Sequence, residues 1–166
     1  MKKITIIIAM LLISICLYGQ ENKIEDIITK IDDASIKSII INQHGGKFQK
    51  SEDIVIYGKP TKSYTYVLSN WKGIGNCKYI SYYSVNGSII GFEFYFIPSI
   101  SKNEILNNFP NNKFITDEKF DGGGLPAIKN IYKENRNNLT MSLSAYTSNP
   151  NLIVILTFYK MDLDKK

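Results

Sequence analysis

Cysteine and histidine are nearly absent from this sequence. Its 166 residues include two cysteines, Cys16 and Cys77, and one histidine, His44. Zinc sites need clusters of these two residue types, so no metal and no other cofactor is expected. Cys16 lies in an apolar N-terminal segment, and once that segment is removed Cys77 has no partner for an intrachain disulfide. We therefore expect a fold that is held together by its hydrophobic core.

Groupings of residues that carry out catalysis are also lacking. His44 stands beside two glycines in an expected turn, and nothing in the spacing indicates that it meets Cys77 as a nucleophilic pair. The glycine run after Asp121 lacks the lysine and the serine or threonine of a phosphate-binding loop. No spacing selects a catalytic pair of carboxylates from the available candidates, Glu93, Glu104, Asp117 and Glu118. The sequence thus favours a protein without enzymatic activity.

Long apolar runs are absent after residue 17. The first residues follow the pattern of a secretory leader, with Lys2 and Lys3 before an apolar stretch over 4–17 and a small residue at Gly19. This pattern predicts a signal peptide over 1–19, cleavage before Gln20 and a periplasmic or secreted protein. Lipid anchoring through Cys16 is the less favoured alternative, because a lipoprotein signal has a small residue just before the cysteine and a leucine three residues before it. Isoleucines occupy both places.

Basic residues are spread along the chain, although the formal net charge is +5. Two of these charges belong to the leader, and no stretch concentrates the others as a nucleic-acid-binding surface would. No nucleic-acid partner and no membrane-spanning segment after the leader are expected. The leader and the richness in Asn, Lys, Ile and Tyr resemble those of exported proteins from the Bacteroides and Flavobacterium group.

The hydrophobic pattern predicts two helices, over 21–33 and 101–109, and one ambiguous segment. Ser101 and Glu104 form a capping box at the start of the second helix. Residues 51–58 fit a short helix, with a strand over 53–57 as the alternative. Asn86-Gly87 is the signal of a two-residue hairpin turn. Strands are expected over 35–42, 62–68, 77–85, 89–97, 112–117, 127–134, 139–146 and 152–160, the last of them central in the sheet.

Together these elements predict a single α+β domain over 20–166, with a largely antiparallel sheet of short strands. The order of a short helix, a proline and an antiparallel meander occurs twice, over 51–98 and 101–160, which suggests two tandem units. The sequence Gly58-Lys59-Pro60, followed by Trp71 and the Asn86-Gly87 hairpin, resembles the α+β repeat of two proteins. They are the beta-lactamase inhibitor protein and the small lipoprotein of the outer-membrane barrel assembly machinery. The resemblance implies a non-catalytic module that binds other proteins.

A candidate binding surface follows from the strand over 89–97. Alternation places its phenylalanines and Ile90 toward the core, and Glu93 and Tyr95 on the accessible face. Regular pairing through the Asn86-Gly87 turn puts Glu93 opposite Ile80 and Tyr95 opposite Lys78. This register adds Tyr82 to the same accessible face. The predicted binding residues are therefore Lys78, Tyr82, Glu93 and Tyr95.

Two functions are expected from these features. The first is an exported, non-enzymatic protein-binding module of the bacterial cell envelope, in particular an inhibitor or immunity factor. The second is a small secreted hydrolase that acts on cell-wall or carbohydrate substrates. The identity of the partner and the oligomeric state do not follow from the sequence.

Overall fold

The computed structural model describes residues 23–29, 32–56, 58–98, 100–122, 124–134, 139–148 and 153–160. The predicted signal peptide, its cleavage site and Cys16 lie outside these ranges. Within them are three helices, α2 (Lys23–Ile28), α3 (Asp33–His44) and α4 (Lys102–Asn107). The strands are β1 (Lys47–Ile56), β2 (Lys59–Val67), β3 (Cys77–Val85), β4 (Ser88–Phe96), β5 (Asn112–Asp121), β6 (Pro126–Glu134), β7 (Leu139–Tyr146) and β8 (Val154–Tyr159).

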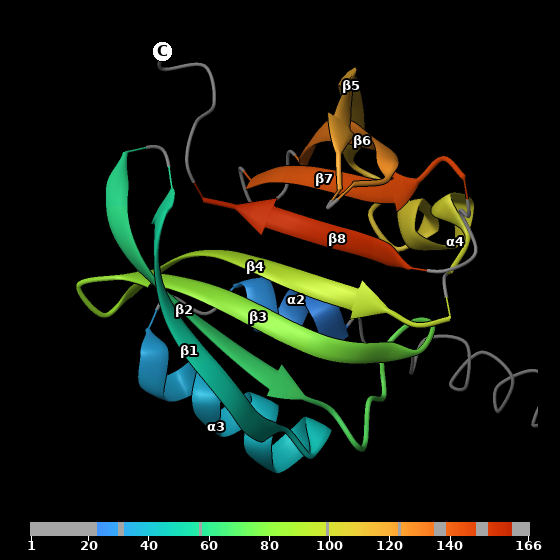
Figure 1. Cartoon of the computed structure of the whole chain (residues 1–166). Helices are drawn as coiled ribbons and strands as arrows, with labels where there is room; N and C mark the ends of the chain where they lie inside the picture. Colours follow the sequence, from blue (N-terminus) through green and yellow to red (C-terminus); the bar gives the residue numbers. More distant parts are fainter. Residues whose placement is uncertain are drawn as a thin grey trace, which may run out of the picture.

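All eight strands form one antiparallel sheet in the order β1-β2-β3-β4-β8-β7-β6-β5. The predicted α+β class with an antiparallel sheet is therefore confirmed. Each half of the chain is a helix followed by a four-stranded meander, and the last strands of the two meanders, β4 and β8, pair at the centre. We call α3–β4 the first unit and α4–β8 the second unit. Figure 1 shows that the sheet twists, so that β1–β4 are seen face-on while β5 and β6 are seen nearly edge-on.

The helices cover one face of the sheet, and α2 and α3 lie behind β1–β4 in Figure 1. Fully buried side chains between helices and strands include Ile24, Ile27, Ile36 and Ile40 from α2 and α3, and Ile105 from α4. From the sheet they include Tyr82, Phe92, Phe94, Phe96, Leu156 and Phe158. The three phenylalanines of β4 thus face the core, as predicted. Among the residues that the structure describes, no helix lies on the opposite face of the sheet, which we call the helix-free face.

The predicted strand over 35–42 is wrong, because this segment forms the helix α3. Asp32 caps the helix, since its carboxylate accepts a hydrogen bond of 2.8 Å from the Ser35 amide. Ile36 and Ile40 then repeat every four residues on the buried side. At the other end, Gly45 adopts the left-handed conformation that closes a helix (φ 61°). The predicted helix over 21–33 is correspondingly shorter, because α2 ends at Ile28 and Asp33 already belongs to α3.

The alternative readings at residues 51–58 are resolved in favour of a strand. Residues 51–56 are the second half of β1, which pairs with β2 up to Ile56 and Lys59. The helix predicted there is wrong, and α3 is instead the helix that precedes the first meander.

Other predictions are confirmed: β3 and β7 have the predicted bounds, and β8 is central. Asn86 and Gly87 have the positive φ angles of the expected turn, and Ser101 caps α4.

The register between β3 and β4 differs from the predicted one because β4 contains an extra residue. Next to the turn, Ser84 pairs with Ile89, as regular pairing requires. Tyr83 then pairs with Gly91, so Ile90 is unpaired in a β-bulge. Beyond the bulge, Ser81 lies opposite Glu93, and Tyr79 opposite Tyr95. The predicted pairs of Glu93 with Ile80 and of Tyr95 with Lys78 are wrong, and so is the core position of Ile90, which its neighbour Ile89 occupies.

Candidate functional site

The helix-free face of the sheet carries every second side chain of its strands. Across the middle of this face, strand pairing places residues of neighbouring strands side by side in one row, and most of them are small and polar. The row includes Glu93 of the central strand β4. The row consists of Thr65, Ser81, Glu93, Thr157, Ser142, Ile131 and Thr116. Tyrosines flank the row, with Tyr79 and Tyr95 on one side and Tyr83 and Tyr159 on the other. A carboxylate thus lies among tyrosines near the centre of the sheet.

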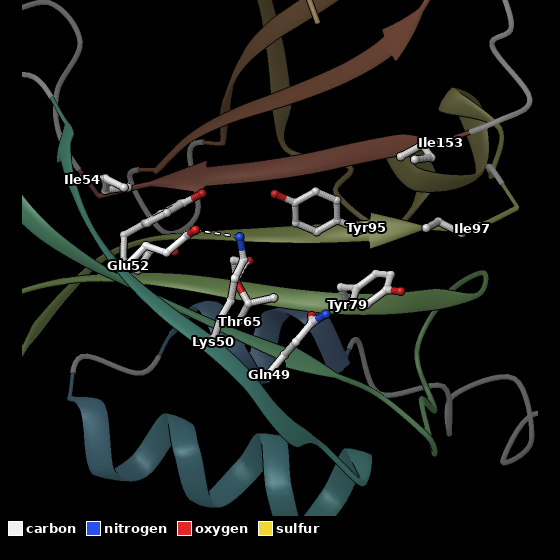
Figure 2. Close-up of a pocket in the computed structure, with 12 residues that line it drawn as sticks. Gln49, Lys50, Glu52, Ile54, Thr65, Tyr79, Tyr95, Ile97 and Ile153 are labelled. Atoms are coloured by element: carbon white, nitrogen blue, oxygen red, sulfur yellow. Dashed lines mark hydrogen bonds and ion pairs between the residues drawn. The ribbon is translucent and has the colours of Figure 1, made fainter. Parts of the chain in front are cut away.

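This face contains a hollow of about 520 Å³, which we call the central hollow. Short polar side chains of β2 and β3 lie between taller ones from β1, β3 and β4, and this difference in length creates the depression. Figure 2 shows Tyr79 and Tyr95 on neighbouring strands, facing the same space as Lys50 and Glu52 of β1. The full lining is Gln49, Lys50, Glu52, Ile54, Ser63, Thr65, Tyr79, Ser81, Tyr83, Tyr95, Ile97 and Ile153.

A smaller, mostly apolar pocket of about 110 Å³ adjoins the central hollow. The two share Ile153, and the smaller pocket lies over the second unit, where Phe120, Tyr146 and Ile155 contribute to its wall. Gly122 leaves space for the Tyr146 ring, since a Cβ at this glycine would lie 2.7 Å from the ring. The helix-free face therefore offers a polar, tyrosine-lined hollow next to an apolar pocket.

A hydrogen bond to Glu93 orients Tyr95 in the central hollow. The Tyr95 hydroxyl donates to Glu93 Oε2 over 2.5 Å. Burial raises the pKa of Tyr83 and of Tyr95, and the negative charge of Glu93 together with hydrogen bonding to it raises both pKa values further. Both phenols therefore keep their protons throughout the physiological pH range. Glu93 itself is half-buried behind these two tyrosines and does not line the hollow.

Gly91 permits the aromatic packing beside Glu93. It is paired with Tyr83 on one side and Tyr159 on the other, and the two rings stack with centroids 6.4 Å apart. A Cβ at Gly91 would lie 2.8 Å from the Tyr159 ring and 2.9 Å from the Phe158 carbonyl oxygen. A side chain at this position would therefore displace the Tyr159 ring.

The polar floor and rim of the hollow are also paired internally. The hydroxyls of Thr65 and Ser81 are 2.9 Å apart across β2 and β3. On the rim, Lys50 Nζ lies 2.8 Å from Glu52 Oε2, and both side chains are about half exposed. This pair has no net charge, and such an exposed pair adds little to stability.

Two of the four predicted binding residues belong to this site. Tyr95 lines the central hollow, and Glu93 is hydrogen-bonded to it. Tyr82 is fully buried on the helix side, where its hydroxyl donates to Asp33 Oδ1, so its predicted exposure is wrong. Lys78 is exposed, but it is the unpaired residue of a second irregularity in β3 and does not line the hollow. A binding role for Lys78, Glu93 and Tyr95 stays a prediction.

The site also contains residues that the sequence interpretation missed, namely Tyr79 and Tyr83 on β3 and Lys50, Glu52 and Thr65 on β1 and β2. The alternation Tyr79-Ser81-Tyr83 was visible in the sequence. Regular pairing puts Tyr82 on the accessible face, and alternation then leaves Tyr79, Ser81 and Tyr83 on the other face of the sheet. A one-residue shift in register moves every side chain of a strand to the other face.

His44 and Cys77 both lie outside the central hollow. His44 packs against Trp71 at the end of α3, with ring centroids 4.9 Å apart. The Cys77 thiol donates to the Tyr79 carbonyl oxygen, and burial raises the pKa of this thiol, which keeps it in the unreactive protonated form. Neither residue has the environment of an activated nucleophile or its base.

The part of the chain that the structure describes contains no group of three His, Cys, Asp or Glu side chains that could hold a metal ion. Within the same ranges, no helix has both the length and the apolar character needed to cross a bilayer. No protein-family model matches the chain, and neither a curated protein nor a solved structure is similar to it.

Proposed function

We propose that this chain is an exported, non-enzymatic module that binds another protein through the helix-free face of its sheet. The observation that carries the proposal is the central hollow on the helix-free face, which is lined by Tyr79, Tyr83 and Tyr95, with the Glu93 carboxylate hydrogen-bonded to Tyr95. Tyrosines are common anchors of protein interfaces, because they are large and stiff and carry a polar tip. An inhibitor or immunity factor directed at another exported protein is the form of this function that we favour.

Cross-linking from defined positions tests the binding face. A photoreactive phenylalanine analogue at Tyr79, in the hollow, should cross-link to a partner in the producing cells. The same analogue at Ile41, which is 47% exposed on α3, is the matched control on the helix side. The variant Thr65→Trp, which fills the hollow, should abolish the cross-link from position 79. A partner that cross-links equally from both positions, or that still cross-links in the Thr65→Trp variant, would contradict the proposal.

Intact-mass measurement tests export separately. Protein purified from a host that secretes it should have the mass of residues 20–166. A mass that includes residues 1–19 would contradict cleavage, and a diacylglycerol on Cys16 would replace the soluble form with an anchored one.

A further inference from the structure

Glu93 has no cationic partner among the residues that the structure describes. The ion pairs there join Lys37 with Asp33, Lys50 with Glu52, and Lys62 with Asp53. Glu93 is nevertheless half-buried on a central strand, and it accepts a hydrogen bond from the neutral Tyr95 hydroxyl. A carboxylate withdrawn from water is costly unless it is compensated, so this negative charge favours a cation that the described residues do not supply.

A hydrogen-bonded tyrosine connects the Glu93 carboxylate to the central hollow. Tyr83 and Tyr95 line the hollow, and the Tyr95 hydroxyl donates its hydrogen to Glu93. A hydroxyl that donates to a carboxylate becomes a stronger acceptor, so the Tyr95 oxygen is suited to accept a hydrogen bond from a ligand. The hydroxyls of Ser81 and Thr65 add further acceptors at the floor. The hollow is thus suited to a ligand that donates several hydrogen bonds.

The remaining charges around the hollow do not oppose a cation. Lys50 and Glu52 on β1 cancel each other at 2.8 Å. The other residues that line the hollow are uncharged, and Lys78 of β3 is not among them. Glu93, next to the hollow, is therefore the nearby charge that no opposite charge among the described ion pairs balances, although the chain as a whole is basic.

We infer that the central hollow receives an arginine side chain of the partner protein. A guanidinium is planar and has five N–H donors, so it can stack on the Tyr79 or Tyr95 ring while donating to several fixed oxygens. The lysine ammonium is a compact point charge that uses this flat, multiply accepting site less well. In this arrangement Tyr83 and Tyr95 contact the guanidinium, and Glu93 acts through Tyr95 as a positioning residue. The inference rests on the proposed binding function, since it names the group that the binding face recognises.

Titration of the isotope-labelled protein with N-acetyl-L-arginine methylamide, followed by NMR, tests the inference. We expect saturable shifts of the Ser81, Glu93 and Tyr95 amide signals. The citrulline analogue, which has the same shape without the charge, should give no saturable shift, and the lysine analogue should bind more weakly. Glu93→Gln keeps an acceptor for Tyr95 and should weaken arginine binding by about tenfold. Glu118→Gln removes the same charge from an exposed position on β5 and should leave the affinity unchanged.

Three results would overturn the arginine site: no saturable shift up to the solubility limit of the compound, equal shifts with citrulline, or unchanged affinity in Glu93→Gln. The thermal midpoints of both variants show whether each remains folded. The outcome is separable from that of the proposed function. If Thr65→Trp abolishes cross-linking to a partner while arginine fails to bind, the binding face is supported and the arginine site is contradicted. If position 79 gives no specific cross-link, the binding function is contradicted, whatever the titration shows.

Discussion

The two units have the same order of elements but contribute unequally to the core. The helix of the first unit, α3, has twelve residues, whereas α4 in the second unit has six. The first unit also packs against α2, whose isoleucines are fully buried. In the second unit, nearly every residue of β5 is exposed, and Phe114 retains 53% of its accessible surface. A repeated order of elements thus does not imply an equal share of the hydrophobic core.

The helix-free face shows a second difference between the units. Over the first unit it carries Tyr79, Tyr83 and Tyr95 with Glu93. Over the second unit, strands β6–β8 present Tyr146, Tyr159, Lys129 and Lys133 on this face, between small or aliphatic side chains such as Ala127, Ser144 and Ile155. The first unit differs in that three tyrosines stand next to one half-buried carboxylate. The unit with the larger core also carries the candidate binding site.

Truncating one phenylalanine in each unit should give the largest contrast. Phe94→Ala removes a fully buried ring that packs against Trp71 and Phe158, and we expect a loss of about 3–5 kcal/mol in the free energy of unfolding. Phe114→Ala, at the β5 edge, should cost less than about 1 kcal/mol. Urea denaturation at equilibrium measures both values. Equal losses would mean that the two units contribute equally to the core.

The next comparison separates the two faces of the first unit. Tyr82→Ala removes a buried ring and its hydrogen bond to Asp33, and should cost about 3–4 kcal/mol. Tyr95→Ala removes a half-buried ring from the helix-free face, and about 1–2 kcal/mol is expected. Thermal and urea unfolding of the two variants test this order. A larger loss for Tyr95 would show that the helix-free face is itself part of the stabilising core.

The smallest effects are expected at the helix caps, which differ between the units in their response to pH. Ser101→Ala at α4 should cost about 1 kcal/mol at every pH, because a serine cap does not titrate. At α3, hydrogen bonds from Ser35 lower the pKa of Asp32 below its usual value of 3.8. A lowered pKa in the folded state means that the charged cap stabilises above that value and that this contribution is lost as the pH falls through the folded pKa.

The difference in melting temperature between the wild type and Asp32→Ala should therefore be constant from about pH 7 to pH 5 and should shrink below about pH 4. Scanning calorimetry over this range measures it, with Ser101→Ala as the matched cap that does not titrate. A pH-independent difference for Asp32→Ala would show that the carboxylate charge does not stabilise α3.

Local signals in the sequence predicted the structure correctly where a single short motif determines it. Asn86-Gly87 predicted its turn, Ser101 predicted its helix, and the alternating residues of β7 predicted the bounds of that strand. The prediction of a strand over 35–42 was wrong because the preference of its isoleucines for strands is weak. The Asp32 cap, the four-residue spacing of Ile36 and Ile40, and Gly45 together outweigh that preference.

The candidate site could be predicted in part. Glu93 and Tyr95 followed from the alternation within β4, which needs no information about a partner strand. The partner side chains depended on the register, and the bulge at Ile90 changes that register beyond the turn. Gly91, a glycine inside a strand, is a local sign of an irregularity, but it does not say which residue is left unpaired. The contributions of Tyr79 and Tyr83 to the hollow therefore required the three-dimensional structure.

The central position of β8 has a consequence for the order of folding. Seven pairings hold the sheet together, and six of them join strands that follow one another along the chain. Only β4 and β8 come from distant parts of the sequence, so closing the sheet is the slow, high-contact-order step. During synthesis β4 emerges long before β8. The backbone edge of β4 that pairs with β8 therefore stays unpaired in the interval. Such an edge can pair with another chain, so a nascent first unit needs shielding until its neighbour arrives.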